Sequence, residues 1–249
     1  TRDSAITPVM LTHNETSTGV TNPLRELAEV VRQHDKLLLV DAVSSMGSVP
    51  CEVDGWGLDV VVSGSQKGWM VPPGMAMVSV SKRAWDATET AKIPRYYFDY
   101  KKARSYLEKG QTPWTPAVSI YFAMDTALRT LQTEGLQNIH ERHARIGQAT
   151  RDGVKALGLK LFADERVASN TVTAVRVPEG VDGAALNKMM RTEYDTVLAG
   201  GQGELTGKIF RVGHLGMVKD ADIQACLDAL KLALPRLGFS PSGVGATAS

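Results

Sequence analysis

The sequence is short of several features that would narrow the class of protein. Only two of its 249 residues are cysteines, Cys51 and Cys226, and acidic and basic residues nearly balance to a net charge of +1. Two cysteines are too few for a disulfide framework, so we expect free thiols and a cytoplasmic protein. The balanced charge gives no sign of a nucleic-acid partner or of an acidic membrane surface.

Long hydrophobic runs are also lacking. The longest apolar stretches, such as residues 37–40, are far shorter than the roughly 20 residues that a helix needs to cross a bilayer. The first residues, TRDSAITPV, do not show the basic-then-apolar order of a signal peptide, and no membrane partner is expected. What is present is ordinary for a globular protein, with 43% hydrophobic and 22% charged residues, enough for one large or two modest domains.

The first third of the chain alternates strand-like and helix-like segments. Short apolar runs predict strands at residues 9–12, 36–40, 58–63 and 75–80. Apolar residues recur at helical spacing over 23–34, with a proline in the first turn, which predicts an amphipathic helix. Continuous apolar strands joined through a helix indicate an α/β fold with a parallel sheet covered on both faces.

The rest of the chain follows a different order. Residues 91–111 are aromatic and basic and are expected to form a long, partly irregular excursion. Two long helices are predicted next, over 116–133 and 135–157. The remaining elements are predicted as strands at 159–162, 171–178, 196–199 and 208–212 and helices at 183–193 and 220–237.

This change of pattern indicates a domain boundary near residue 134. Residues 1–134 are predicted to belong to a larger α/β domain, and residues 135–238 to a smaller α+β domain. Residues 239–249 are small and polar and are predicted to be a disordered tail. No internal repeat and no low-complexity segment interrupts this division.

Polar groups follow the first three predicted strands. HNETSTGV follows the first strand, Asp41 ends LLLVD, and Lys67 lies in SGSQKG. Taken singly, Asp41 resembles a turn or helix-capping residue, Lys67 a surface lysine, and Ser17 and Thr18 a hydroxyl-containing turn. Because ligands of open α/β sheets bind beyond the carboxyl ends of the strands, we expect the three groups to face one crevice.

Motifs for other common chemistries do not match. SGSQKG lacks both the earlier glycine and the following Ser or Thr of a phosphate-binding loop, and no GxGxxG follows a strand. A GxSxG nucleophile elbow is absent. The histidines show no metal-ligand spacing, and His140 and His143 lie on the polar side of a predicted helix, where we expect them to be solvated.

A lysine and a strand-end aspartate together suit pyridoxal 5'-phosphate (PLP). The lysine amine forms a Schiff base with the cofactor's aldehyde. The aspartate pairs with the pyridine nitrogen and keeps it protonated, so that the ring accepts electrons. The candidates are Lys67 and Asp41.

Five motifs carry a resemblance to a known family. In chain order they are HNETSTGV, LLLVDAVSS, SGSQKGWMVPPG, QTPWTPAVS and FRVGHLG. This series resembles the class V PLP-dependent aminotransferases, most closely the alanine–glyoxylate and serine–glyoxylate (serine–pyruvate) group, and runs from about residue 8 to residue 238. The resemblance implies PLP fold type I, which is aspartate-aminotransferase-like: a large domain on a mostly parallel sheet and a smaller α+β domain.

The resemblance also implies roles for residues around the cofactor. Lys67 would carry the Schiff base, and Gln66 would hydrogen-bond near the ring oxygen or the phosphate. Asp41 would pair with the ring nitrogen, and Val43 would pack on the ring face. These four residues come from two adjacent strand ends.

Four further residues are implied as cofactor or substrate contacts. Ser17 and Thr18 match hydroxyls near the ring oxygen, and Thr115 matches a threonine that reaches the phosphate in the neighbouring subunit. Arg211, in FRVGHLG, matches the arginine that binds the substrate carboxylate, a role that suits a planar, always-charged guanidinium. The implied reaction transfers an amino group from alanine or serine to glyoxylate or another small 2-oxo acid, in a homodimer.

One departure from the family concerns the part before HNETSTGV. Relatives carry there the turn and helix N-terminus that hold the phosphate and an aromatic residue that stacks on the ring. None of this precedes Thr12 in the present sequence. We therefore expect a fragment, or one piece of a cleaved protein with a companion N-terminal chain; alone, this piece would lack part of the cofactor site.

Two alternatives remain open. One is another PLP reaction on the same scaffold, such as a lyase or desulfurase. A desulfurase needs a reactive cysteine on a mobile loop, and neither Cys51 nor Cys226 lies in such a context. The other is a catalytically incomplete chain that acts as a subunit, since some family members carry the names of subunits of unrelated oxidoreductases.

Overall fold

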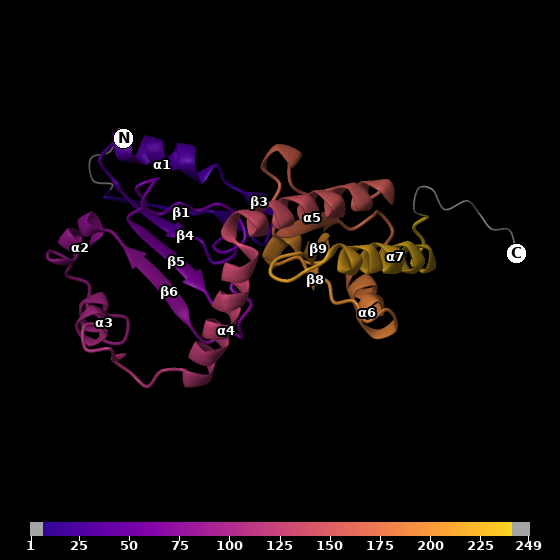
Figure 1. Ribbon diagram of the computed structural model, residues 1–249. Helices are drawn as coiled ribbons and strands as arrows, with labels where there is room; N and C mark the ends of the chain where they lie inside the picture. Colours follow the sequence, from indigo (N-terminus) through magenta and orange to yellow (C-terminus); the bar gives the residue numbers. More distant parts are fainter. Residues whose placement is uncertain (1–6, 241–249) are drawn as a thin grey trace, which may run out of the picture.

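The computed structural model describes residues 7–240, whose first half is built on a four-stranded sheet in the order β1, β4, β5, β6 (Figure 1). These strands are β1 (Pro8–Thr12), β4 (Leu37–Asp41), β5 (Val60–Gly64) and β6 (Ala76–Val80). The first three run parallel, and β6 runs antiparallel at the edge. The predicted α/β class with a mostly parallel sheet is therefore confirmed.

Helix α1 (Leu24–Gln33) covers one face of this sheet (Figure 1). Pro23 precedes the helix, at a position where its missing N–H is not needed. The contact buries aliphatic side chains of both layers, namely Leu24 and Ala28 of the helix and Leu38, Val40 and Val61 of the strands. Residues three and four apart lie on one side of a helix, and alternate residues lie on one face of a strand, so both patterns direct apolar side chains into this interface.

The opposite face of the sheet is covered only at its β6 edge within residues 7–240, where Val78 and Val80 line a hollow with Trp85, Tyr97 and Phe98. The prediction of a sheet covered on both faces is therefore only partly met by this part of the chain. Side chains alternate along a strand, and the register places Met10, Leu39, Val62 and Val78 on this face. Met10 is 76% exposed and Val78 is 40% exposed. We call this surface the open sheet face.

After β6 the chain forms an arm over residues 81–117. The arm contains α2 (Lys82–Thr88) and α3 (Tyr100–Leu107). The hydroxyl of Ser81 accepts a hydrogen bond from the Ala84 N–H, and the carboxylate of Asp99 accepts two from the start of α3, so both helices have N-caps. The sequence analysis missed α2 and described the region of α3 only as partly irregular.

Two long helices follow, α4 (Val118–Glu134) and α5 (Leu136–Ala156). Gly135 separates them with a φ of +84°, a backbone conformation that favours glycine. Both helices are confirmed close to their predicted bounds. Met124 and Ala127 of α4 pack on Val71, just after the Lys67 segment, so α4 supports that part of the first domain.

The C-terminal half is a three-stranded antiparallel sheet with helices packed on it. Its sheet has the order β7, β9, β8. The elements are β7 (Val172–Arg176), α6 (Gly183–Glu193), β8 (Ala199–Gly200), β9 (Ile209–Gly213) and α7 (Asp220–Arg236), with short 3-10 turns at Glu165–Val167 and Gly203–Leu205. This arrangement matches the predicted small α+β layer.

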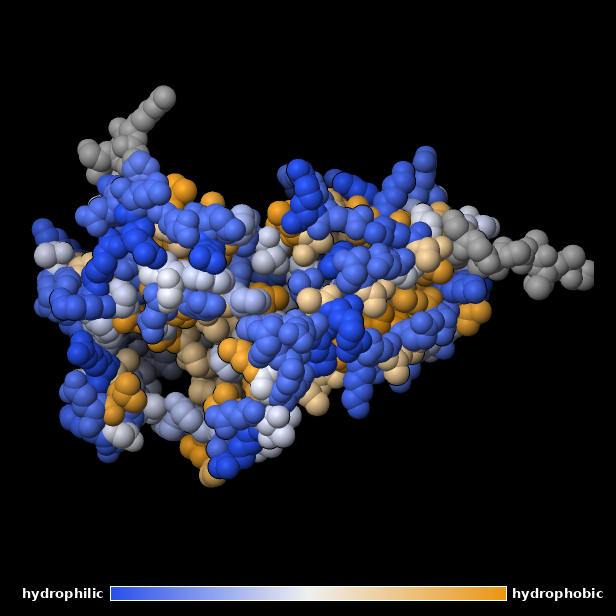
Figure 2. All heavy atoms as spheres, turned by 45° about the horizontal axis from the view of Figure 1, so that its top comes forward, coloured by the Kyte–Doolittle hydropathy of each residue, from blue (hydrophilic) through white to orange (hydrophobic). Residues whose placement is uncertain are grey.

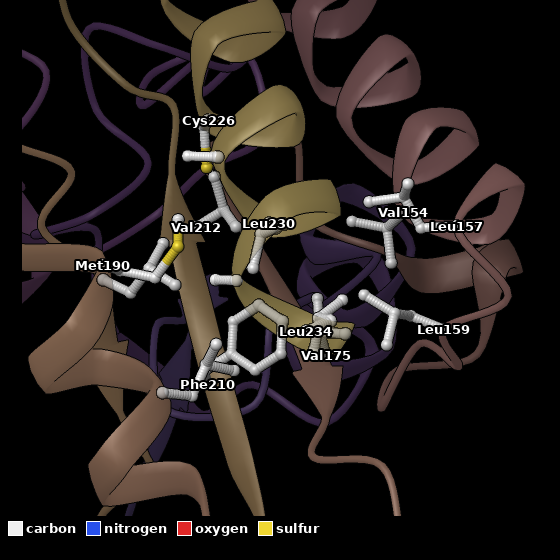
Figure 3. Packing of buried hydrophobic residues seen from close by; sticks show 14 of the residues in the cluster. Val154, Leu157, Leu159, Val175, Met190, Phe210, Val212, Cys226, Leu230 and Leu234 are labelled. Atoms are coloured by element: carbon white, nitrogen blue, oxygen red, sulfur yellow. The ribbon is translucent and has the colours of Figure 1, made fainter. Parts of the chain in front are cut away.

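The core of this half lies between β9, α7 and α5 (Figure 3). Phe210, Leu230, Leu234 and Met190 are completely buried there. Each such side chain stabilises the fold by about 1.5–3 kcal/mol relative to an exposed position. Arg211 follows Phe210 on β9, so this core fixes the strand that carries it.

Three predictions about this half need correction. Residues 159–162 are not a strand but make one isolated bridge, between Leu161 and Val175. The strand predicted at 196–199 is the two-residue β8. Phe239 packs against the core and is not part of a tail, while residues 241–249 lie outside the described part of the chain. Within residues 7–240 none of the helices combines the length and the apolar character needed to cross a membrane.

Candidate active site

Asp41 is the last residue of β4, in the middle of the carboxyl edge of the sheet. It pairs in register with Thr12 of β1 and Val62 of β5. Its Oδ1 accepts a hydrogen bond of 2.9 Å from the Val43 N–H, which starts the turn that follows, and its side chain is exposed. The carboxylate is therefore held in position by its own turn while remaining accessible.

Lys67 lies in a compact loop after β5. The Ser65 hydroxyl donates to the Pro72 carbonyl at 2.8 Å, and the Val71 N–H donates to the Ser65 carbonyl at 3.1 Å, which closes the loop at its base. Met70 has a φ of +61°, an unusual conformation for a side chain of this kind. Lys67 is half-buried, and its amine has no hydrogen-bond or ion-pair partner among residues 7–240.

The Asp41 turn and the Lys67 loop are packed directly on each other. A Cβ on Gly68 would lie 2.5 Å from the Met46 carbonyl oxygen and 2.5 Å from Ser48 Oγ. Only glycine fits such a contact without displacing the backbone. The amine and the carboxylate thus come from two loops whose separation is set by backbone contact.

The hairpin of β2 (Asn14–Glu15) and β3 (Val20–Thr21) carries Ser17 and Thr18. The Ser17 hydroxyl donates to Glu15 Oε1 at 2.6 Å, and the Ser17 N–H donates to the same oxygen. Gly19, with a φ of +72°, lies so close to the small domain that an added Cβ would be 3.0 Å from the Ala174 nitrogen. The hairpin therefore leaves the first domain and packs on the second.

Arg211 brings a positive charge from the small domain to this hairpin. Its Nη1 donates to the Thr16 carbonyl at 2.9 Å, and its Nε donates to the Gly200 carbonyl at 3.0 Å. The residue is only 7% exposed and forms no ion pair with any residue of the described chain. Buried charges are normally paired, so this guanidinium is suited to an anionic ligand.

A second contact joins the small domain to the Lys67 loop. A Cβ on Gly216 would lie 3.2 Å from Cγ of Met70. The Gly216 carbonyl accepts a 2.6 Å hydrogen bond from Arg142, and its N–H donates to Nε2 of His143 at 3.1 Å. Helix α5 thereby fixes the loop after β9 against the loop of Lys67.

His143 and His214 are neutral structural groups on this side of the molecule. His143 is 1% exposed, which corrects the expectation that it is solvated. Its Nδ1 lies 2.7 Å from the Ile139 carbonyl and must donate, so Nε2 accepts from Gly216. Burial lowers the pKa of His143, and it lowers the pKa of His214 to about 3.

The predicted site residues are not all brought together. Gln66 is exposed beside Gly64, and Val43 is half-buried in the Asp41 turn. Thr115 is exposed at the end of the arm, where it lines a hollow of about 700 Å³ with Trp114 and Tyr121. That hollow does not include the Lys67 loop, so any role of Thr115 would concern another surface.

Sequence reasoning missed the residues that hold the site together. Asn14 and Ser44, which are buried, and Thr16, which is half-buried, form a hydrogen-bonded cluster between the hairpin and the Asp41 turn. The resemblance draws attention to Ser17 and Thr18 of the motif HNETSTG and implies no role for Asn14. The sequence signal for Asn14 is weak: it is a polar residue two positions after the end of β1.

Comparison with known proteins decides the family. Residues 3–229 match the domain family described as aminotransferase class V. The chain belongs to the class V aminotransferase family. Members of this family use PLP, so the resemblance seen in the five motifs is confirmed.

The relatives have two kinds of name. The "Soluble hydrogenase, small subunit" of Synechococcus sp. is 49% identical over 96% of this chain and 62% of its own length. The serine–glyoxylate aminotransferase of Arabidopsis thaliana is 38% identical over 98% of this chain and 63% of its own length. The crystal structure of pyridoxamine–pyruvate aminotransferase from Mesorhizobium loti superimposes with a TM-score of 0.90, at 35% identity, over 95% of this chain and 62% of that one.

The chain thus spans a little over three fifths of the length of these relatives. Within that part, the available groups fit the reactive end of PLP. Lys67 offers an amine that has no partner among the described residues and is suited to the aldehyde, and Asp41 offers an accessible carboxylate for the ring nitrogen. Arg211 adds a buried guanidinium that has no counter-ion in the described part of the chain and could bind a carboxylate.

Proposed function

We propose that the protein to which this chain belongs transfers an amino group from a small amino acid, alanine or serine, to glyoxylate or another small 2-oxo acid, with PLP as cofactor. The observation that carries the proposal is Arg211. Its guanidinium is 7% exposed and has no acidic partner in the described chain. It contacts the β2–β3 hairpin at Thr16, and the same hairpin also contacts the Asp41 turn. Carboxylate is the group shared by both substrates of such a transfer.

Three residues divide the work. Lys67 would hold the cofactor covalently through its amine and, once released, would move a proton from the substrate Cα. Asp41 would hold positive charge on the ring nitrogen, and its own turn keeps the carboxylate in place. When bound, PLP supplies an electron sink that makes the Cα–H acidic.

Arg211 would determine which bond of the substrate is aligned for reaction. Two carbonyl oxygens, of Thr16 and Gly200, already hold the guanidinium, so little reorganisation is needed when a carboxylate binds. These two carbonyls accept from Nε and Nη1, so Nη2 is the guanidinium nitrogen that they leave available for a carboxylate. A lysine at this position would keep the charge but lose the planar geometry.

A substrate panel with the full-length, PLP-loaded protein tests this proposal. We expect keto-acid formation from L-alanine or L-serine with glyoxylate. Arg211→Lys should raise the KM of both the amino acid and glyoxylate about tenfold or more. Arg176→Lys, an exposed arginine on β7, is the matched control and should leave both values unchanged. Equal KM values in the wild type and the Arg211→Lys variant would contradict the role of Arg211.

The open sheet face supports a second part of the proposal. Met10 and Val78 expose apolar side chains from strands that should be covered in a stable α/β unit. We infer that the active protein includes further chain, either preceding Thr1 or as a companion N-terminal chain, that packs on this face and completes the phosphate site. A full-length protein that binds PLP no better than residues 1–249 alone would contradict this inference.

A homodimer is proposed on the surface of the arm. Ile93 is 81% exposed, Tyr96 75%, Phe98 84%, and Phe122 at the start of α4 is 73% exposed. Exposed apolar residues gathered on one segment are typical of protein interfaces. Figure 2 shows a mainly hydrophilic surface with hydrophobic atoms beside a hollow at the lower left. Thr115 lies on this same arm, as a residue reaching a neighbouring subunit would.

Two alternatives are separated by experiment. Release of sulfide from L-cysteine would indicate a desulfurase, although Cys51 is half-buried and Cys226 is buried, and burial raises the pKa of each thiol to about 11. The hydrogenase-subunit names of some relatives suggest a non-catalytic subunit. The absence of any amino-group transfer by the full-length protein would favour that reading.

A further inference from the structure

Asn14 occupies an unusual place between the two domains. It is 3% exposed, and its side-chain amide makes four hydrogen bonds. Nδ2 donates to Ser44 Oγ at 2.9 Å and to Thr171 Oγ1 at 3.0 Å. Oδ1 accepts from Thr21 Oγ1 at 2.6 Å and from Ser169 Oγ at 2.5 Å. Two of the partners belong to the first domain and two to the small domain.

The direction of every bond follows from counting protons. The Ser44 hydroxyl donates to the Asn14 carbonyl oxygen at 2.8 Å and accepts from the Thr16 hydroxyl at 2.8 Å. The Ser169 hydroxyl donates its one proton to Asn14 Oδ1. The Thr171 hydroxyl must therefore donate to Ser169 Oγ and accept from Asn14 Nδ2. The position therefore needs a group with two donors and two acceptors, which a primary amide provides.

The hydrogen-bond partners of Asn14 in both domains are close to residues with a proposed chemical role. Ser44 lies three residues after Asp41, in the turn that the aspartate starts. Thr16, bonded to Ser44, offers its carbonyl to the Arg211 guanidinium. On the small-domain side, the Thr171 carbonyl accepts from the His214 N–H at 2.9 Å, three residues after Arg211.

We propose that Asn14 is a positioning residue that sets the distance and orientation of Arg211 relative to Asp41. It acts through Ser44 and Thr16 on one side and through Thr171 on the other, and it touches neither cofactor nor substrate, since all four of its hydrogen-bonding sites are occupied. This inference rests on the proposed aminotransferase function, in which the substrate carboxylate on Arg211 must lie at a fixed distance from the ring.

The consequence is a specific kinetic signature. Without the cross-domain bonds, Arg211 samples more than one position, and binding of a carboxylate must select one of them. The KM of both carboxylate substrates rises for that reason, whereas a loss of folded protein would lower only the amount of active enzyme.

The chain offers a matched pair of variants. Thr171→Val removes a hydroxyl that Asn14 reaches across the domain boundary, and Thr21→Val removes one within the hairpin itself. In the full-length, PLP-loaded protein we expect Thr171→Val to raise the KM of L-serine and of glyoxylate about three- to tenfold, and Asn14→Ala to raise both about tenfold or more. Thr21→Val should stay within about twofold of the wild type.

A second measurement does not depend on turnover. Calorimetric titration with glycolate, an unreactive carboxylate, should show the same order of weakening: none for Thr21→Val, several-fold for Thr171→Val. Should the wild type fail to transaminate, the proposed function is lost, while the glycolate series still tests Asn14. Should Asn14→Ala not fold, the threonine pair carries the test.

Two results would overturn the inference. One is equal behaviour of Thr171→Val and Thr21→Val in KM and in glycolate affinity. The other is a wild type that does not bind glycolate at all, because Arg211 would then have no carboxylate for Asn14 to position.

Discussion

Gly68 is the position where a single methyl group should separate the two loops of the site. In Gly68→Ala, the new Cβ would lie 2.5 Å from the Met46 carbonyl oxygen and 2.5 Å from Ser48 Oγ. The serine side chain can rotate, but the carbonyl belongs to the backbone of the Asp41 turn and must shift. Overpacking of this kind costs about 1–3 kcal/mol, a noticeable part of the 5–15 kcal/mol typical of a folded domain.

The matched control is Gly213→Ala at the end of β9. An added Cβ there meets no atom within 4 Å, and no positive φ is required. Alanine should be neutral or stabilise by up to about 1 kcal/mol, through the unfolded chain. Urea unfolding of the full-length protein measures both effects, and titration of the apoprotein with PLP measures the second consequence, weaker cofactor binding in Gly68→Ala only. Unchanged stability and unchanged PLP affinity of Gly68→Ala would refute the account of how Lys67 and Asp41 are brought together.

Three other changes are expected to have measurable effects. Asp41→Asn keeps the hydrogen bond from Val43 but loses the charge, so kcat should fall about a hundredfold while the unfolding midpoint stays the same; an unchanged kcat would contradict the role of the carboxylate. The pKa of His214 is lowered to about 3 by burial, so the unfolded chain binds a proton that the folded chain does not, and this group should lower the free energy of unfolding by up to about 1.4 kcal/mol per pH unit as the pH drops from 6.5 to 5; His13, whose pKa burial lowers to about 4, adds to the slope. Urea midpoints across that range test this, and His214→Gln should reduce the slope without abolishing it, because His13 still contributes. Replacing Phe98 and Phe122 by serine should shift the full-length protein from dimer to monomer in light scattering, and a dimer of unchanged stability would place the interface elsewhere.

Much of the fold was predictable because the signals are local. The strands of the first domain, α1, α4 and α5 follow from apolar periodicity and from Pro23 and Gly135 at their ends. Helix α2 could have been predicted from Ser81 as an N-cap. The open sheet face could not be predicted. An apolar run indicates that a strand has apolar side chains on both faces of the sheet, but it does not show which elements cover those faces.

The site was predictable only in part for a similar reason. Lys67 and Asp41 follow directly from strand ends, since parallel strands deliver their next residues to one edge. Arg211 was predicted from a motif, and its burial, with no counter-ion within residues 7–240, is a property of the folded chain. Asn14 was missed because its four partners are up to 157 residues away, and such pairings leave no trace in local spacing.

The central claim is that Lys67 holds PLP through its amine. Reduction of the full-length, PLP-loaded protein with borohydride, followed by digestion and mass spectrometry, tests it most directly. The account predicts a pyridoxyl phosphate adduct on the peptide that contains Lys67 and its complete absence in Lys67→Ala. An adduct on another lysine, or amino-group transfer that persists in Lys67→Ala, would contradict it.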